Sequence, residues 1–200
     1  MKVQRGAIII ADISGYTHFV KMHVISVLHA EGVLSELMKS IANEFKSPIK
    51  LVKLEGDAAL FFAPFVEGKE AEIIKQATEQ AIHSFRAFNA LRDQHLCICQ
   101  ACLGLQSLTL KIVFHVGDVV EKSLLDVEEL TGDDMVIAHR LLKNSVKSHQ
   151  YFLMSDKYYH FAKNILPLKP ESREEAVEGF GKIKVEVFDG KSILKDSAKV

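Results

Sequence analysis

The hydrophobic pattern of the chain begins with an apolar run at residues 7–12, short enough to be a buried strand. After a glycine, residues 17–45 repeat apolar side chains at helical spacing, and Gly32 is expected to bend or split that helix. Residues 49–62 hold two further apolar runs around a turn at residues 55–57, which predicts a hairpin. The first third of the chain is therefore expected to run strand, helix, strand, strand.

The rest of the chain continues this alternation, and its clearest helix is expected at residues 71–91, where apolar side chains form one stripe. Further elements are expected as strands at 108–120 (interrupted at Gly117), 151–154, 177–180 and 183–188, and as helices at 135–142 and 157–162. This order predicts the α+β class, a ferredoxin-like α/β sandwich with helices packed on a mostly antiparallel sheet. We expect one domain over residues 1–190 and a flexible tail over residues 191–200.

Composition limits the classes of function. The 200 residues are 48% hydrophobic, which excludes intrinsic disorder, and no apolar stretch is long enough to predict a membrane span. The net charge of −1 gives no basic field for nucleic acid or for an anionic membrane. The N-terminus has no secretory pattern, and three cysteines within six residues make a poor disulfide framework. We therefore expect a cytoplasmic protein without a nucleic-acid partner.

Two aspartates are the first candidates for chemistry. Asp12 ends the first apolar run, and Asp57 lies on the hairpin turn after Gly56. Two carboxylates at neighbouring strand ends would form a hard oxygen site suited to Mg²⁺ or Mn²⁺. The glycine-containing turn after Asp12 would offer backbone N–H groups to a phosphate. The alternative is a helix cap and a turn residue, because aspartates before a helix often serve as N-caps.

Five short segments carry motifs whose order and spacing can be compared with known proteins. They are IIIADISGYT at residues 8–17, LVKLEGDAA at 51–59, VFHVGDVV at 113–120, GDDMVIAHR at 132–140 and VEGFGKIKVEVF at 177–188. Taken together, they resemble the motifs of class III nucleotidyl cyclase catalytic domains. The resemblance covers residues 7–189, nearly the whole chain, and implies the nucleotidyl cyclase type of sandwich.

The resemblance implies a metal-binding half of the site. Asp12 and Asp57 would hold two divalent metal ions, Mg²⁺ or Mn²⁺. Backbone groups of Ile13, Ser14 and Gly15 would contact the triphosphate and a metal. Metal ions at such a site activate the nucleophile and neutralise the leaving group.

The same resemblance implies a base-reading half. Lys53 would contact the adenine edge, and Glu129 stands at the place of the second base-reading residue. Arg140 would stabilise charge on the phosphate during ring closure. In this family two domains pair head to tail, and each chain supplies one half of each site, so a homodimer is implied. ATP would be the favoured nucleoside triphosphate, with cyclic AMP as its product.

Several positions depart from the family pattern. The family's transition-state asparagine is replaced by Val136, which can neither donate nor accept a hydrogen bond. The triphosphate-binding lysine of the terminal hairpin falls near Phe180, and Lys182 or Lys184 would have to substitute for it. Glu55 adds a carboxylate where an apolar residue is usual. The metal-binding half is therefore expected to be intact and the catalytic half eroded.

A second candidate metal site lies in a cysteine-bearing insertion near residues 95–105. It would use His95, Cys97, Cys99 and Cys102. Zinc takes a Cys₃His set in tetrahedral geometry, so a structural Zn²⁺ could staple this insertion. The alternative is that the three residues are reduced cysteines buried in an apolar loop, which are common.

These observations lead to one leading hypothesis and two alternatives. The leading hypothesis is a divergent cyclase that binds a purine nucleoside triphosphate with a divalent metal and forms cyclic AMP and pyrophosphate from ATP. The first alternative is a cyclase relative that has lost catalysis and serves as a nucleotide-binding or dimerising regulator, favoured by Val136 and Phe180. The second is a metal or redox sensor built on the three cysteines.

Overall fold

The computed structural model describes residues 1–21, 27–94, 104–124 and 127–196. The strands are β1 (Lys2–Ser14), β2 (Lys50–Glu55), β3 (Ala58–Pro64), β4 (Thr109–Leu124), β5 (Val127–Thr131), β6 (Tyr151–Ser155), β7 (Glu171–Val177) and β8 (Gly181–Asp189). The helices are α1 (Tyr16–Lys21), α2 (Val27–Ala42), α3 (Glu70–Gln94), the 3-10 turn η1 (Leu105–Ser107), α5 (Asp133–Leu141), α6 (Asp156–Ala162) and α7 (Gly190–Asp196).

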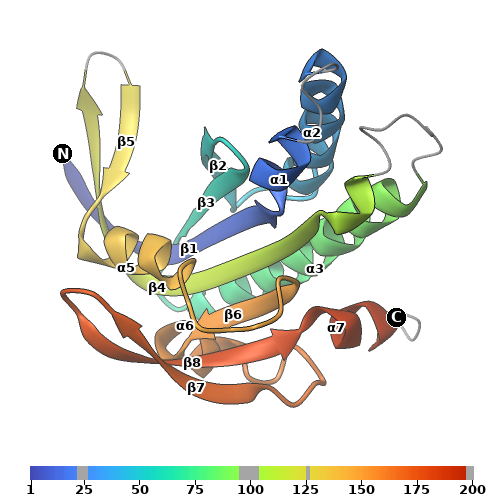
Figure 1. Cartoon of the computed structure of the whole chain (residues 1–200). Coiled ribbons are helices and arrows are strands. Elements are labelled where there is room, and N and C mark those ends of the chain that lie inside the picture. The colour runs from blue at the N-terminus through green and yellow to red at the C-terminus, as the bar shows by residue number, and fades with distance from the viewer. Residues whose placement is uncertain (22–26, 95–103, 125–126, 197–200) are drawn as a thin grey trace.

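The strands form one sheet in the order β2-β3-β1-β4-β6-β8-β7, with β5 added as a hairpin partner of β4 (Figure 1). The pairing of β4 with β6 is parallel, and the other pairings are antiparallel. The predicted α+β sandwich with a mostly antiparallel sheet is therefore confirmed.

Both faces of the sheet are covered by helices, which explains the continuous apolar run of β1. Ile9 and Ile13 point into the core that α2, α3 and α6 complete. Ile8 and Ile10 alternate with them and join the smaller core beneath α5. Asp12 has the same parity as Ile8 and Ile10, so it stands at the end of the strand on the α5 face.

Three elements differ from the expectations. The predicted helix over residues 17–45 is two helices, α1 and α2, with residues 22–26 outside the described part. Gly32 lies inside α2 and does not end it. Strand β4 runs through Gly117 without interruption. It continues into a hairpin with β5, which the pattern did not predict because the acidic residues of β5 are typical of a solvated loop.

The C-terminal region also differs. The hairpin strand predicted at residues 177–180 begins earlier, as β7, and Phe180 lies in the turn before β8. Instead of fraying from Lys191, the chain forms α7, because Ile193 is buried at 2% exposure and packs into the main core. Among the described residues, no helix has both the length and the apolar character needed to cross a membrane.

Candidate functional site

The end of β1 and the β2–β3 turn meet at the two candidate metal ligands. The backbone N–H of Ile13 donates to the carbonyl oxygen of Asp57 at 2.9 Å, which ties the turn to the strand beside Asp12. Burial raises the pKa of Asp57, and the neighbouring charge of Asp12 raises it further. The two carboxylates are therefore close enough to repel each other, as a shared cation site requires.

A lysine that the sequence analysis did not single out lies beside this pair. Antiparallel pairing of β1 with β4 sets Asp12 opposite Lys111, and the lysine Nζ lies 2.9 Å from Asp12 Oδ2. Both side chains are mostly buried, at 18% and 16% exposure. The only hint in the sequence was a lysine within the apolar run of β4, whose partner strand could not be read from the pattern.

The donor set at this strand end fits a hard divalent cation. Asp12 and Asp57 supply carboxylate oxygens, which Mg²⁺ and Mn²⁺ prefer. The Lys111 ammonium also donates to the carbonyl oxygen of Leu142 at 3.3 Å, so it has a second partner when Asp12 turns to a metal. Lys111 and a metal ion would together place positive charge next to a phosphate.

The turn after β1 needs a glycine. Gly15 has φ of +94°, and its carbonyl accepts the Phe19 N–H at 3.0 Å as α1 begins. A Cβ at this position would lie 3.0 Å from the Ser107 carbonyl oxygen. The chain therefore turns sharply after Ser14, and the peptide groups of residues 13–15 stay next to Asp12 and Asp57.

A cleft of about 400 Å³ gathers the second set of predicted residues. Lys53 comes from β2, Glu129 from β5, and Val136 and Arg140 from α5. Residues far apart in the sequence thus line one concavity, with Gly132 at the N-terminal end of α5.

The charges in this cleft are paired. Lys53 Nζ lies 2.7 Å from Glu55 Oε1, and this hydrogen bond lowers the pKa of Glu55. Glu129 pairs with Lys122 at 3.0 Å, and His139 lies 3.9 Å from the other oxygen of Glu55. Lys53 and Glu55 are both exposed, so a ligand can compete for either group at small cost.

Arg140 leans toward the β7–β8 turn. Its guanidinium carbon lies 5.8 Å from the centre of the Phe180 ring, and Nη2 lies 3.8 Å from Glu178. The predicted Lys182 does not line the cleft; it pairs with Glu174 across the hairpin at 3.2 Å. Lys184 is 4.0 Å from Asp156.

Asp57 and the base-reading residues line different hollows of one chain. Asp57 lines a hollow against α2 together with Ile13 and Tyr16, whereas Lys53 and Arg140 line the cleft beneath α5. Because β2 presents alternate side chains to its two faces, Leu54 belongs to the first hollow and Lys53 to the second.

Helix α5 is held in place by a buried polar network. His115 lies 2.8 Å from Ser155 through Nδ1 and 2.9 Å from Asp134 through Nε2. Burial lowers the pKa of His115, so the neutral ring donates to Asp134 and accepts from the Ser155 hydroxyl. Asp134 also accepts the backbone N–H of Asp118 at 2.8 Å and pairs with Lys157 at 2.9 Å.

Gly117 makes this network possible, because a Cβ there would overlap the carboxyl group of Asp134. We expect Gly117→Ala to lower the free energy of unfolding by about 1–3 kcal/mol, since the added methyl overpacks the site. Gly32→Ala is the matched control: nothing lies within 4 Å of that position, and alanine in a helix should stabilise by about 0.5–1 kcal/mol. Urea denaturation measures both; equal effects would show that Gly117 is not a contact position.

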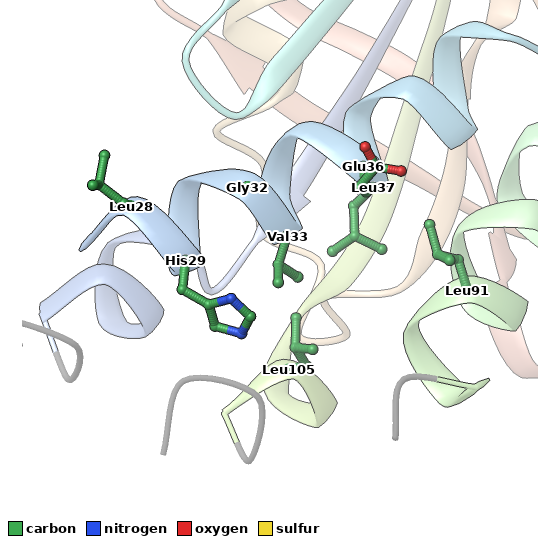
Figure 2. A pocket seen from close by; sticks show the side chains of 8 residues that line it. All are labelled: Leu28, His29, Gly32, Val33, Glu36, Leu37, Leu91 and Leu105. Atoms are coloured by element: carbon green, nitrogen blue, oxygen red, sulfur yellow. The ribbon is translucent and has the colours of Figure 1, made fainter. Parts of the chain in front are cut away.

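The predicted zinc ligands His95, Cys97, Cys99 and Cys102 lie outside the described residues. Within the described part of the chain, no group of three or more His, Cys, Asp or Glu side chains is arranged to hold a metal ion. A hollow of about 500 Å³ between α2, the end of α3 and η1 is lined mainly by apolar side chains such as Val33, Leu37 and Leu105 (Figure 2). Among the described residues, none of those predicted to contact the nucleotide or the Mg²⁺ or Mn²⁺ ions lines it.

Residues 34–151 match the family described as a protein of unknown function, DUF2652. The chain belongs to this family. An uncharacterized protein of Mycobacterium tuberculosis, Rv2561/Rv2562, is 35% identical to this chain over 124 residues, which are 62% of this chain and 57% of that protein. The chain thus spans less than two thirds of the length of this curated relative.

Solved structures extend the comparison from the DUF2652 family to a fold. The guanylyl cyclase Cya2 superposes with a TM-score of 0.71 at 14% identity, covering 93% of this chain and 92% of that one. The guanylate cyclase domain of RhGC from Catenaria anguillulae, in complex with GTP, gives 0.65 at 20% identity, covering 95% and 100%. The adenylyl cyclase CyaB from P. aeruginosa gives 0.64 at 18%, covering 94% and 97%. The class III cyclase type of fold is therefore confirmed for this DUF2652 protein.

Proposed function

We propose that this protein binds a purine nucleoside triphosphate together with Mg²⁺ or Mn²⁺, at a site formed between two copies of the chain. The observation that carries the proposal is the separation of two complementary residue sets. Asp12, Asp57 and Lys111 meet at one strand end, while Lys53 and Arg140 line a different cleft. A twofold dimer brings the first set of one chain to the second set of the other, twice.

The metal-binding half acts on the phosphates. Asp12 and Asp57 would hold the divalent ion, which when bound neutralises phosphate charge and polarises the α-phosphate. Lys111 would give one more positive charge beside it, and the peptide N–H groups of residues 13–15 would donate to phosphate oxygens. A bound cation would lower the pKa of Asp57, because its positive charge would outweigh the repulsion between Asp57 and Asp12.

The base-reading half selects the nucleotide. Lys53 and Glu129 both line the cleft, and together they can donate to and accept from the edge of a purine. We favour ATP because the Lys53 ammonium can only donate hydrogen bonds. The ring nitrogens at the edge of adenine carry no hydrogen and can accept them. Among the fold relatives, one guanylate cyclase domain is in complex with GTP, and a rhodopsin-guanylyl cyclase with converted specificity is in complex with ATPαS.

Turnover of ATP would give cyclic AMP and pyrophosphate, with Arg140 stabilising charge on the reacting phosphate. A second candidate is a nucleotide-binding regulator without catalysis. Two observations favour it: Val136, 40% exposed, presents an apolar side chain to the cleft, and Arg140 is drawn toward Phe180 and Glu178. Incubation of the purified protein with ATP or GTP and Mn²⁺, followed by detection of cyclic product, separates the two candidates.

We expect Val136→Asn to raise the rate of cyclic AMP formation at least about tenfold, because one preorganised donor supplies about 10²–10³ in rate at such sites. Val136→Leu, which keeps the position apolar, is the control and should leave the rate unchanged. The measurement is cyclic nucleotide formed from ATP and Mn²⁺ under saturating conditions. A variant that binds ATP without any gain in rate would favour the regulator.

A further inference from the structure

Another cleft lies on the face of the sheet opposite α5, between α3, α7 and the segment after α6. Its volume is about 360 Å³, at the small end of the roughly 300–1,000 Å³ of ligand pockets. Its walls are mostly apolar and include Ile82, Leu166, Leu168 and Ile193, of which Leu166 and Ile193 are buried. Of the described residues, none that is assigned to nucleotide or metal lines this cleft.

One cationic side chain in this cleft has no ion-pair partner among the described residues. Arg86, on α3, lines the cleft, and its Nε is buried without any hydrogen-bond partner. Within the described residues it makes no ion pair. The acidic group on the rim, Glu79, is exposed and lies 3.9 Å from Lys75 instead. Buried polar groups in proteins are nearly always satisfied, so an orphaned guanidinium N–H in a residue that lines a cleft indicates a missing acceptor, which Nε would meet once the side chain turns toward the cleft.

The chemistry of the cleft defines what that acceptor is. A guanidinium presents its N–H groups as a planar fork that matches a carboxylate with two parallel hydrogen bonds. The apolar side chains around it favour a hydrocarbon or aromatic body attached to the carboxylate. A phosphate fits less well, because its second negative charge would sit near Glu79 and lose more hydration than one arginine restores.

We propose that this cleft binds a small monocarboxylate with an apolar body, whose carboxylate pairs with Arg86 and whose body packs against Ile82, Leu166 and Ile193. The site is separate from the nucleotide site, because its lining shares no residue with the Asp57 hollow or with the cleft beneath α5. The bound molecule would contact α3 on one side and α7 on the other.

The test uses octanoate as the probe and the full-length protein. We expect octanoate to raise the Tm of the protein and to give a binding isotherm in titration calorimetry. Octanamide has the same hydrocarbon body without the charge and should bind at least about tenfold more weakly. Arg86→Met keeps the apolar stem and should lose at least about tenfold in octanoate affinity. Lys75→Met removes an exposed cation from the same helix and should change nothing.

Three results would overturn the proposal: no binding of octanoate to the wild-type protein, equal binding of octanoate and octanamide, or undiminished binding by Arg86→Met. If Arg86→Met fails to fold, Arg86→Lys keeps the charge without the planar fork and should also bind octanoate more weakly. ATP binding with Mn²⁺, measured in parallel, should be unaffected by Arg86→Met, so failure of this site is distinguishable from failure of the nucleotide site.

Discussion

Asp57→Asn is expected to weaken Mn²⁺-dependent binding of ATP by at least about a hundredfold and to raise the Tm of the metal-free protein at pH 7. The first effect follows because a metal ligand is lost, and even residues that only support such ligands cost about 10–100-fold. The second follows because Asp57 is a half-buried carboxylate next to Asp12. Titration with a fluorescent ATP analogue and thermal denaturation measure the two effects.

The pH dependence of the second effect gives an internal check. Burial, together with Asp12, raises the pKa of Asp57 in the folded protein above its ordinary value of 3.8. The folded state therefore holds this proton more tightly, and the stability so contributed is lost as pH rises from 3.8 through the folded pKa. The gain from Asp57→Asn should be present at pH 7 and disappear as the pH falls toward 3.8.

The matched control is Glu31→Gln, which removes an exposed carboxylate from the same hollow. Glu31 accepts a hydrogen bond from the Tyr16 hydroxyl at 3.1 Å and has no role in the proposed metal site. ATP affinity should not change in this variant. Unchanged ATP affinity in Asp57→Asn as well would remove the proposed metal site.

A mixture of Asp57→Asn chains and Arg140→Met chains is expected to recover nucleotide binding that neither variant shows alone. In a heterodimer, Asp57 of the second chain and Arg140 of the first form one intact site, while the other site carries both changes. Random pairing makes about half of the dimers heterodimers, so about a quarter of all sites should be restored. The measurement is the stoichiometry of ATP bound with Mn²⁺, before and after mixing.

The control for this mixture is a double variant that carries both substitutions in one chain, mixed with the Arg140→Met chain. Every site in that mixture lacks Arg140, so no binding should return. Recovery in the first mixture together with none in the second would establish the shared site. A protein that stays monomeric at high concentration, with and without ATP, would contradict it.

Local patterns in the sequence were sufficient to predict the elements that carry the fold. The run at residues 7–12 predicted β1 because a strand buried on both faces must be apolar at every position. The stripe at residues 71–91 predicted α3 because a helix buries one face. The turn at residues 55–57 predicted the β2–β3 hairpin, and five ordered motifs predicted the cyclase type of sandwich.

Features that depend on contacts between distant segments were not predicted. The sequence of β5 has the acidic character of a solvated loop. It forms a strand because it pairs with β4, and a local pattern does not show that pairing. The tail folds as α7 because Ile193 finds a place in the core, a gain that no local propensity records. Both cases show tertiary packing overriding a weak local preference.

The candidate site divides in the same way. The aspartates, Lys53 and Arg140 could be named from the sequence because their neighbours form motifs, and each residue type implies a chemistry. Lys111 could not, because its importance lies in the register that sets it opposite Asp12 across two strands almost a hundred residues apart. The sequence also did not show that Lys182 lies outside the cleft, where it pairs with Glu174 across the hairpin. Side-chain chemistry is written in the sequence, but which charges meet is decided by strand register and packing, which are properties of the folded chain.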